Sequence, residues 1–67
     1  MEKIKLMFCG TEKTHTEGNT IECYANVSGE ISIILIEEDS SPTIVSLDKQ
    51  TAIRFAKELR KQISLID

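Results

Sequence analysis

Two cysteines and one histidine are the residues of this chain best suited to chemistry at a single site. Cys9 and Cys23 enclose His15 within the polar stretch CGTEKTHTEGNTIEC. A zinc site needs about four ligands, commonly in closely spaced pairs, and these three residues are widely separated. A catalytic cysteine needs an activated thiol beside a base, and no neighbour of Cys9 in the sequence promises that. We therefore interpret residues 10–19 as a long connection between strands and expect no catalytic residue, metal or cofactor.

The elements that flank this connection follow from the spacing of apolar residues. Apolar and polar side chains alternate with a period of two over residues 3–8, 21–27 and 30–37, which predicts three strands. A short fourth strand is expected over 43–47, after the polar loop EDSSP. The four strands follow one another without an intervening helix, which is typical of an antiparallel meander.

The turn between the second and third strands sets their register. A three-residue loop with Gly29 in the left-handed conformation places apolar residues opposite one another. The expected pairs are Ala25 with Ile31, Cys23 with Ile33 and Ile21 with Leu35. A loop centred near Ser40 is expected to pair Leu35 with Val45 and Ile33 with Leu47.

The last twenty residues predict an amphipathic helix. Asp48 is a good N-cap, whose carboxylate can accept a hydrogen bond from the amide of Gln50 or Thr51. A single apolar stripe follows at helical spacing, with Ile53 and Phe55 at its flanks. The stripe consists of Ala52, Ala56, Leu59, Ile63 and Ile66.

These elements predict an α+β fold in one domain over residues 1–67, a four-stranded antiparallel meander with one C-terminal helix packed on one face (ββββα). The helix is expected to cover the face that carries Leu6, Phe8, Ile21, Cys23, Ile31, Ile33, Leu35, Val45 and Leu47. Cys9 falls on the opposite face from Cys23, which argues against a disulfide between them.

The opposite face of the sheet is also partly apolar, and one helix covers one face only. Isolated apolar residues are common on surfaces, but contiguous patches tend to mark contact sites. We therefore expect the chain to bind protein and to form a homodimer. The residues expected at the interface are Met7, Tyr24, Ile34, Ile36 and Ile44.

The charges are unevenly distributed along the chain. Three lysines and eight acidic residues give residues 1–47 a net charge of −5, whereas five basic and three acidic residues give residues 48–67 a net charge of +2. Nucleic acid is therefore an unlikely partner overall. No segment is typical of a targeting or membrane-spanning sequence, so the cytoplasm is expected. Small size and acidity favour an accessory protein or a stoichiometric inhibitor, for example a phage protein that blocks a host nuclease or defence complex.

One alternative rests on a resemblance. Four strands followed by a helix that is entered through Ile44-Val45-Ser46-Leu47-Asp48 resemble, in the order of elements, the single-stranded-DNA-binding domain of the transcriptional coactivator family. That resemblance implies a dimer that binds single-stranded nucleic acid. The sheet of that family is basic and rich in aromatic residues, unlike residues 1–47 here. In this alternative the phosphate contacts are expected on the helix, at Arg54, Lys57 and Lys61.

Overall fold

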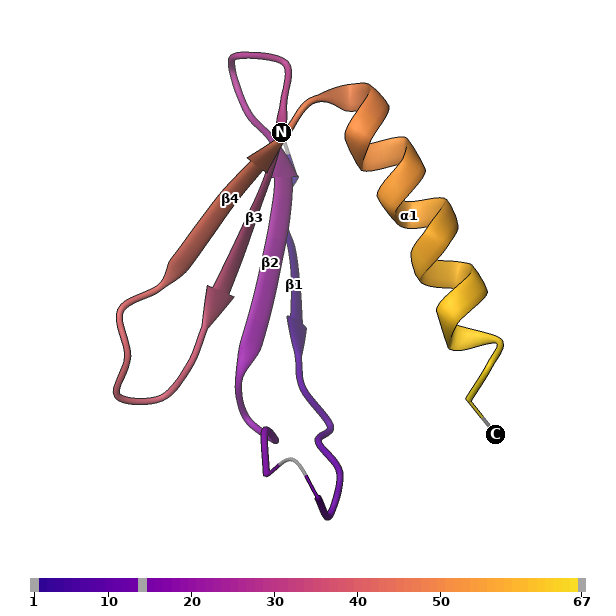
Figure 1. Cartoon of the computed structure of the whole chain (residues 1–67). Coiled ribbons are helices and arrows are strands. Elements are labelled where there is room, and N and C mark those ends of the chain that lie inside the picture. The colour runs from indigo at the N-terminus through magenta and orange to yellow at the C-terminus, as the bar shows by residue number, and fades with distance from the viewer. Residues whose placement is uncertain (1, 14, 67) are drawn as a thin grey trace.

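The computed structural model describes residues 2–13 and 15–66, and it contains four strands and one helix in the expected order (Figure 1). The strands are β1 (Ile4–Met7), β2 (Thr20–Ala25), β3 (Ile31–Ile36) and β4 (Thr43–Leu47), and the helix is α1 (Lys49–Ile63). The strands form one antiparallel sheet in the order β1-β2-β3-β4. The predicted ββββα fold class is confirmed.

The β2–β3 register is the one expected from the sequence, with Ala25 opposite Ile31. Gly29 has a φ of 78°, a conformation that glycine adopts without the steric cost of a Cβ atom. β2 ends two residues earlier than expected because Asn26 begins the turn. Its side-chain oxygen accepts hydrogen bonds from the backbone amides of Ser28 (2.9 Å) and Glu30 (3.0 Å).

The predicted β3–β4 register is wrong by two residues. Leu35 pairs with Thr43 instead of Val45, and Ile33 pairs with Val45 instead of Leu47. The loop closes earlier than expected because Asp39 adopts a φ of 62°, which aspartate tolerates better than most residues. A shift of two residues keeps every side chain on its expected face, since side chains alternate with a period of two.

The helix begins at a well-formed N-cap. The carboxylate of Asp48 accepts hydrogen bonds from the hydroxyl of Thr51 (2.6 Å) and from its backbone amide (3.1 Å). These two donors hold the pKa of Asp48 below its ordinary value of 3.8. Only Asp48 separates β4 from α1, so the capped turn sets the direction in which the helix leaves the sheet.

The helix lies on the predicted side of the sheet but covers less of it than expected. It is close to the sheet near the end of β4 and diverges from the strands toward its C-terminal end (Figure 1). Leu6 and Val45, which the helix was expected to cover, remain 60% and 49% exposed. Among the described residues no apolar side chain is buried. The helix therefore packs on the expected face but leaves part of the surface that it was expected to cover exposed.

The N-cap predicts a specific loss of helix stability in acid. Because the folded protein lowers the pKa of Asp48, the stabilising effect of the cap is present above the ordinary pKa and is lost as the pH falls through the folded value. Asn is an equally good N-cap but does not titrate. We expect the Asp48→Asn protein to lose less helix stability than the wild type between neutral pH and about pH 3. Thermal unfolding followed by circular dichroism measures this difference, and equal losses would contradict it.

Candidate binding surfaces

The outer face of the sheet, which points away from the helix, carries the residues expected at the interface. Ile34 and Ile44 are directly opposite one another on β3 and β4, and Ile36 follows on the same face. Ile44 is 65% exposed, whereas Ile34 and Ile36 are half-buried. The structure therefore brings these three isoleucines together as an outer apolar patch.

The other two expected interface residues lie apart from this outer apolar patch. Met7 on β1 is 70% exposed, and Thr20 of β2 stands between it and Ile36. Tyr24 is opposite Ser32, and the ammonium of Lys3 lies 5.3 Å from the centre of its ring. Tyr24 thus belongs to the polar end of the outer face.

A polar strip crosses the outer face, and the sequence alone did not reveal it. Its members, Thr20, Glu22 and Ser32, are the buried polar residues of the described chain. Glu22 forms an ion pair with Lys3 at 3.2 Å (Nζ to Oε1). The hydroxyl of Ser32 accepts a hydrogen bond from the side-chain amide nitrogen (Nδ2) of Asn26 at 3.0 Å. The predicted β2–β3 register could have indicated this strip, since it places the charged Glu22 on the outer face beside Ile34.

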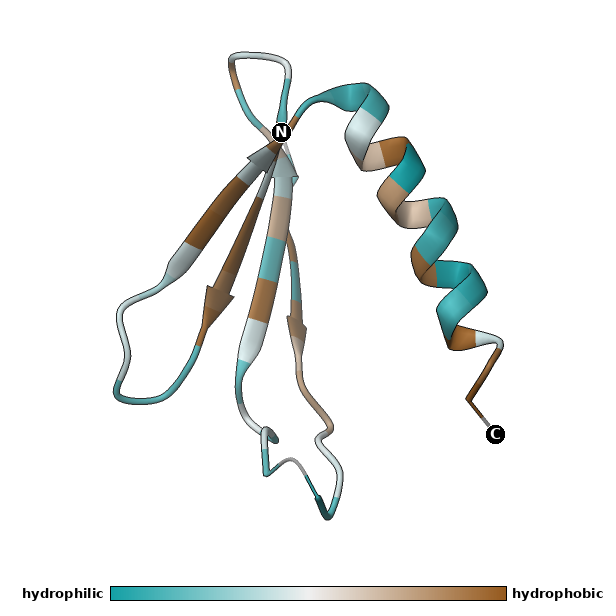
Figure 2. Ribbon diagram, viewed as in Figure 1, coloured by the Kyte–Doolittle hydropathy of each residue, from teal (hydrophilic) through white to brown (hydrophobic). Residues whose placement is uncertain are grey.

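The inner face, which points toward the helix, is more uniformly apolar than the outer one. Figure 2 shows hydrophobic residues along β3 and β4 and alternating hydrophobic and hydrophilic residues on β2. The register places the apolar half of this alternation on the inner face. The inner face consists of Ile4, Leu6, Ile21, Cys23, Ala25, Ile31, Ile33, Leu35, Val45 and Leu47.

An apolar wedge separates the inner face from the first turns of the helix. Its volume is about 330 Å³, and it is lined by Ile21, Ile33, Val45 and Leu47 of the sheet and by Thr51 and Phe55 of the helix. Phe55 is 52% exposed although it belongs to the edge of the helical stripe. The wedge is large enough to accept several side chains, and its lining is almost entirely hydrocarbon.

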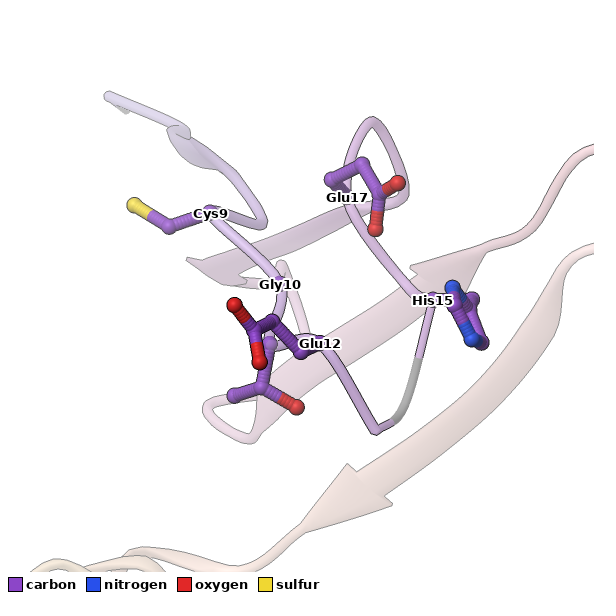
Figure 3. A pocket seen from close by; sticks show the side chains of 6 residues that line it. Cys9, Gly10, Glu12, His15 and Glu17 are labelled. Atoms are coloured by element: carbon purple, nitrogen blue, oxygen red, sulfur yellow. The ribbon is translucent and has the colours of Figure 1, made fainter.

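The loop that carries Cys9 and His15 forms a second, open hollow of about 420 Å³ (Figure 3). The sulfur of Cys9 points away from the imidazole of His15, so this loop does not place that imidazole beside the thiol. Glu12 and Glu17 line the same hollow, but no group of three potential metal ligands gathers within residues 2–13 and 15–66. Cys9 and Cys23 are both free thiols, and Cys23 lies on the inner face as expected.

The basic residues of the helix are exposed to solvent. Arg54, Lys57 and Lys61 are all exposed, and Lys61 lies 3.9 Å from Glu58 (Nζ to Oε1). Residues 49–63 contain five basic residues and one acidic residue, so the helix carries a net charge of +4. The helix is therefore opposite in charge to residues 1–47.

Comparison of the chain with protein-family models, with curated proteins and with solved structures finds no match. None of the described helical residues form a helix that is both long enough and apolar enough to cross a membrane.

The ion pair between Lys3 and Glu22 gives a test of the outer face. The side chain of Glu22 is only 11% exposed, so substitution of Lys3 leaves a shielded carboxylate without its ion-pair partner. We expect Lys3→Met to reduce the free energy of unfolding by about 1 kcal/mol. Lys5→Met is the matched control. Lys5 also lies opposite Glu22 on β1, but the ion pair with Glu22 is formed by Lys3. Urea denaturation measures both, and an equal or larger effect at Lys5 would contradict the assignment.

Proposed function

We propose that this chain is a non-enzymatic protein-binding module that acts as a homodimer. The observation that carries the proposal is the exposure of large apolar side chains on every element except β2 and β3. Among them, Leu6, Ile44 and Ile63 are 60%, 65% and 58% exposed. A stable soluble domain rarely leaves so much apolar surface in water, and such surface is typical of contact sites. The divergent side chains of Cys9 and His15 favour binding over catalysis.

We assign the outer apolar patch, whose residues were expected from the sequence at the interface of a homodimer, to a second, different protein. Ile34, Ile36 and Ile44 form its centre, with Met7 and Tyr24 at its margins. The polar groups of the buried strip beside it already have partners within the chain. The contact area for another protein therefore comes from the outer apolar patch. A small apolar centre with a polar rim is the usual anatomy of such interfaces.

The charge of the sheet favours a partner with a basic surface. Residues 1–47 carry a net charge of −5, and Glu37, Glu38 and Asp39 are exposed in the loop next to the outer apolar patch. A nuclease or another nucleic-acid-binding complex has a basic surface of this kind. We therefore propose an accessory protein or stoichiometric inhibitor of such a complex, as phages and mobile elements encode, with the cytoplasm as its site of action.

Substitution of Ile44 tests the outer apolar patch. Ile44→Glu adds a charge at the centre of the proposed contact, and it should not disturb the fold because Ile44 is already largely exposed. Val27→Glu is the control, since Val27 lies in the β2–β3 loop and is 97% exposed. We expect the immobilised wild type and the Val27→Glu variant to capture the same protein from a native lysate. The Ile44→Glu variant is expected not to capture it. Capture by all three would overturn the assignment of this patch.

The nucleic-acid alternative depends on Arg54, Lys57 and Lys61, which are exposed on one helix face. The outer face of the sheet offers only Tyr24 as an aromatic surface for base stacking, so contacts would be confined to phosphates. We expect a single-stranded oligonucleotide to show no retardation by the protein in gels at low salt. Retardation that weakens steeply with added salt and is lost in Lys57→Glu would favour the alternative instead.

A further inference from the structure

The chain exposes much more surface than a compact monomer of its size. The exposed area is 5924 Å² for a mass of 7.5 kDa. Compact monomers of this mass expose about 4,200 Å², so about 1,700 Å² per chain lies in excess. The radius of gyration is 13.4 Å, whereas a compact chain of 67 residues has about 11 Å. The excess has a structural origin, because the helix diverges from the inner face (Figure 1).

The second half of the helix leaves large apolar side chains partly exposed. Contacts between α1 and the sheet involve β4, near the start of the helix. Farther along the stripe, Leu59 and Ile63 are 47% and 58% exposed. On the other side of the apolar wedge, Leu6 on β1 is 60% exposed. Two apolar surfaces, one on the helix and one on the sheet, are thus only partly covered in the same chain.

The junction between β4 and α1 opposes simple closure of the helix onto its own sheet. One residue, Asp48, connects the two elements, and its carboxylate holds Thr51 by two hydrogen bonds. A short and capped junction leaves few rotatable bonds that could change the helix direction without loss of the cap. The capped junction therefore favours the helix direction that leaves the apolar wedge open.

We infer that a second copy of this chain fills the apolar wedge, with helix α1 of each copy lying on the inner face of the other. The inference rests on the homodimer proposed above and specifies its geometry. Such an exchange is isologous, because the same two surfaces meet twice about a two-fold axis. The stripe through Leu59 and Ile63 then packs on Leu6 and Ile33 of the other copy.

Charge favours this arrangement over the other ways of pairing two copies. The helix carries +4 and residues 1–47 carry −5. Helix-on-helix pairing would bring two basic elements together, and sheet-on-sheet pairing would bring two acidic ones together. Helix-on-sheet pairing is the arrangement that avoids both like-charged combinations, which interfaces disfavour.

The area also agrees with a second copy as the occupant. Burial of the excess of about 1,700 Å² on each of two chains gives about 3,400 Å² in total, which lies within the 2,000–5,000 Å² typical of obligate homodimers. A short peptide in the apolar wedge of about 330 Å³ would leave the C-terminal half of the helical stripe, with Leu59 and Ile63, exposed.

Sedimentation equilibrium of the purified protein tests the inference without any other partner. We expect the wild type to sediment with twice its chain mass of 7.5 kDa, and Leu59→Glu to sediment with that mass itself. Gln50→Glu is the matched control, since it adds the same charge on the basic side of the helix and should leave the dimer intact. Ile44→Glu on the outer face should also remain dimeric.

The outcomes separate this inference from the proposed function. A monomeric wild type at micromolar concentration would overturn both the helix exchange and the homodimer. A dimer that survives Leu59→Glu but dissociates with Ile44→Glu would overturn the exchange alone and leave the homodimer in place. Loss of protein capture by Ile44→Glu, with the dimer retained, concerns the outer apolar patch only.

A second measurement on the wild type covers the case in which Leu59→Glu fails to fold. Dimers are prepared from a mixture of isotope-labelled and unlabelled chains, and isotope-filtered nuclear Overhauser spectra detect contacts between chains. We expect contacts from the methyl groups of Leu59 and Ile63 to those of Leu6 and Ile33. Their absence in a dimeric sample would overturn the exchange.

Discussion

The register of the β2–β3 hairpin is the constraint on which the rest of the structure depends. Gly29 closes a three-residue turn, and the side-chain oxygen of Asn26 accepts hydrogen bonds from the backbone amides of Ser28 and Glu30. Because strand side chains alternate with a period of two, a slip by one residue would move Ile21 and Cys23 outward and Glu22 inward. The correct register creates a continuous apolar inner face, and that face must be covered. The position of the helix and the proposed dimer both follow from this need.

A chain of this size has few ways to cover such a face. The described residues contain one helix, which carries a narrow apolar stripe. The capped turn at Asp48 sets the direction of this helix. Among the described residues no apolar side chain is fully buried, so the hydrophobic stabilisation available within a single copy is incomplete. Folding and association are then expected to be linked, as in other small proteins whose cores are completed between subunits. Stability and protein concentration would be inseparable.

Local patterns predicted the elements well, and long-range geometry was predicted poorly. The period of two, the glycine turn and the Asp48 cap are each encoded within a few residues, so the strands, the β2–β3 register and the start of the helix were foreseen. The β3–β4 register was wrong because the left-handed conformation of Asp39 could not be recognised in a loop of many polar residues. Coverage of the inner face was overestimated, since helical periodicity gives the direction of a stripe and not the distance to the sheet. The positions of Ile34 and Ile44 were foreseen, but the polar strip through Glu22 emerged only from the pairing of three strands.

The two faces of the sheet differ in a way that separates self-association from partner binding. The inner face is almost wholly apolar, as is typical of permanent interfaces, whereas the outer face combines a small apolar corner with satisfied polar groups, as is typical of reversible ones. Exchange of helices between inner faces would turn both outer faces outward, on opposite sides of the dimer. Each dimer would then present two copies of Ile44 and of the acidic loop around Glu38. Two linked sites raise the apparent affinity for a partner that itself has repeated or paired surfaces, without any additional contact. A basic complex built from several subunits would be such a partner, so the geometry of the proposed dimer and the charge of the sheet favour the same class of target.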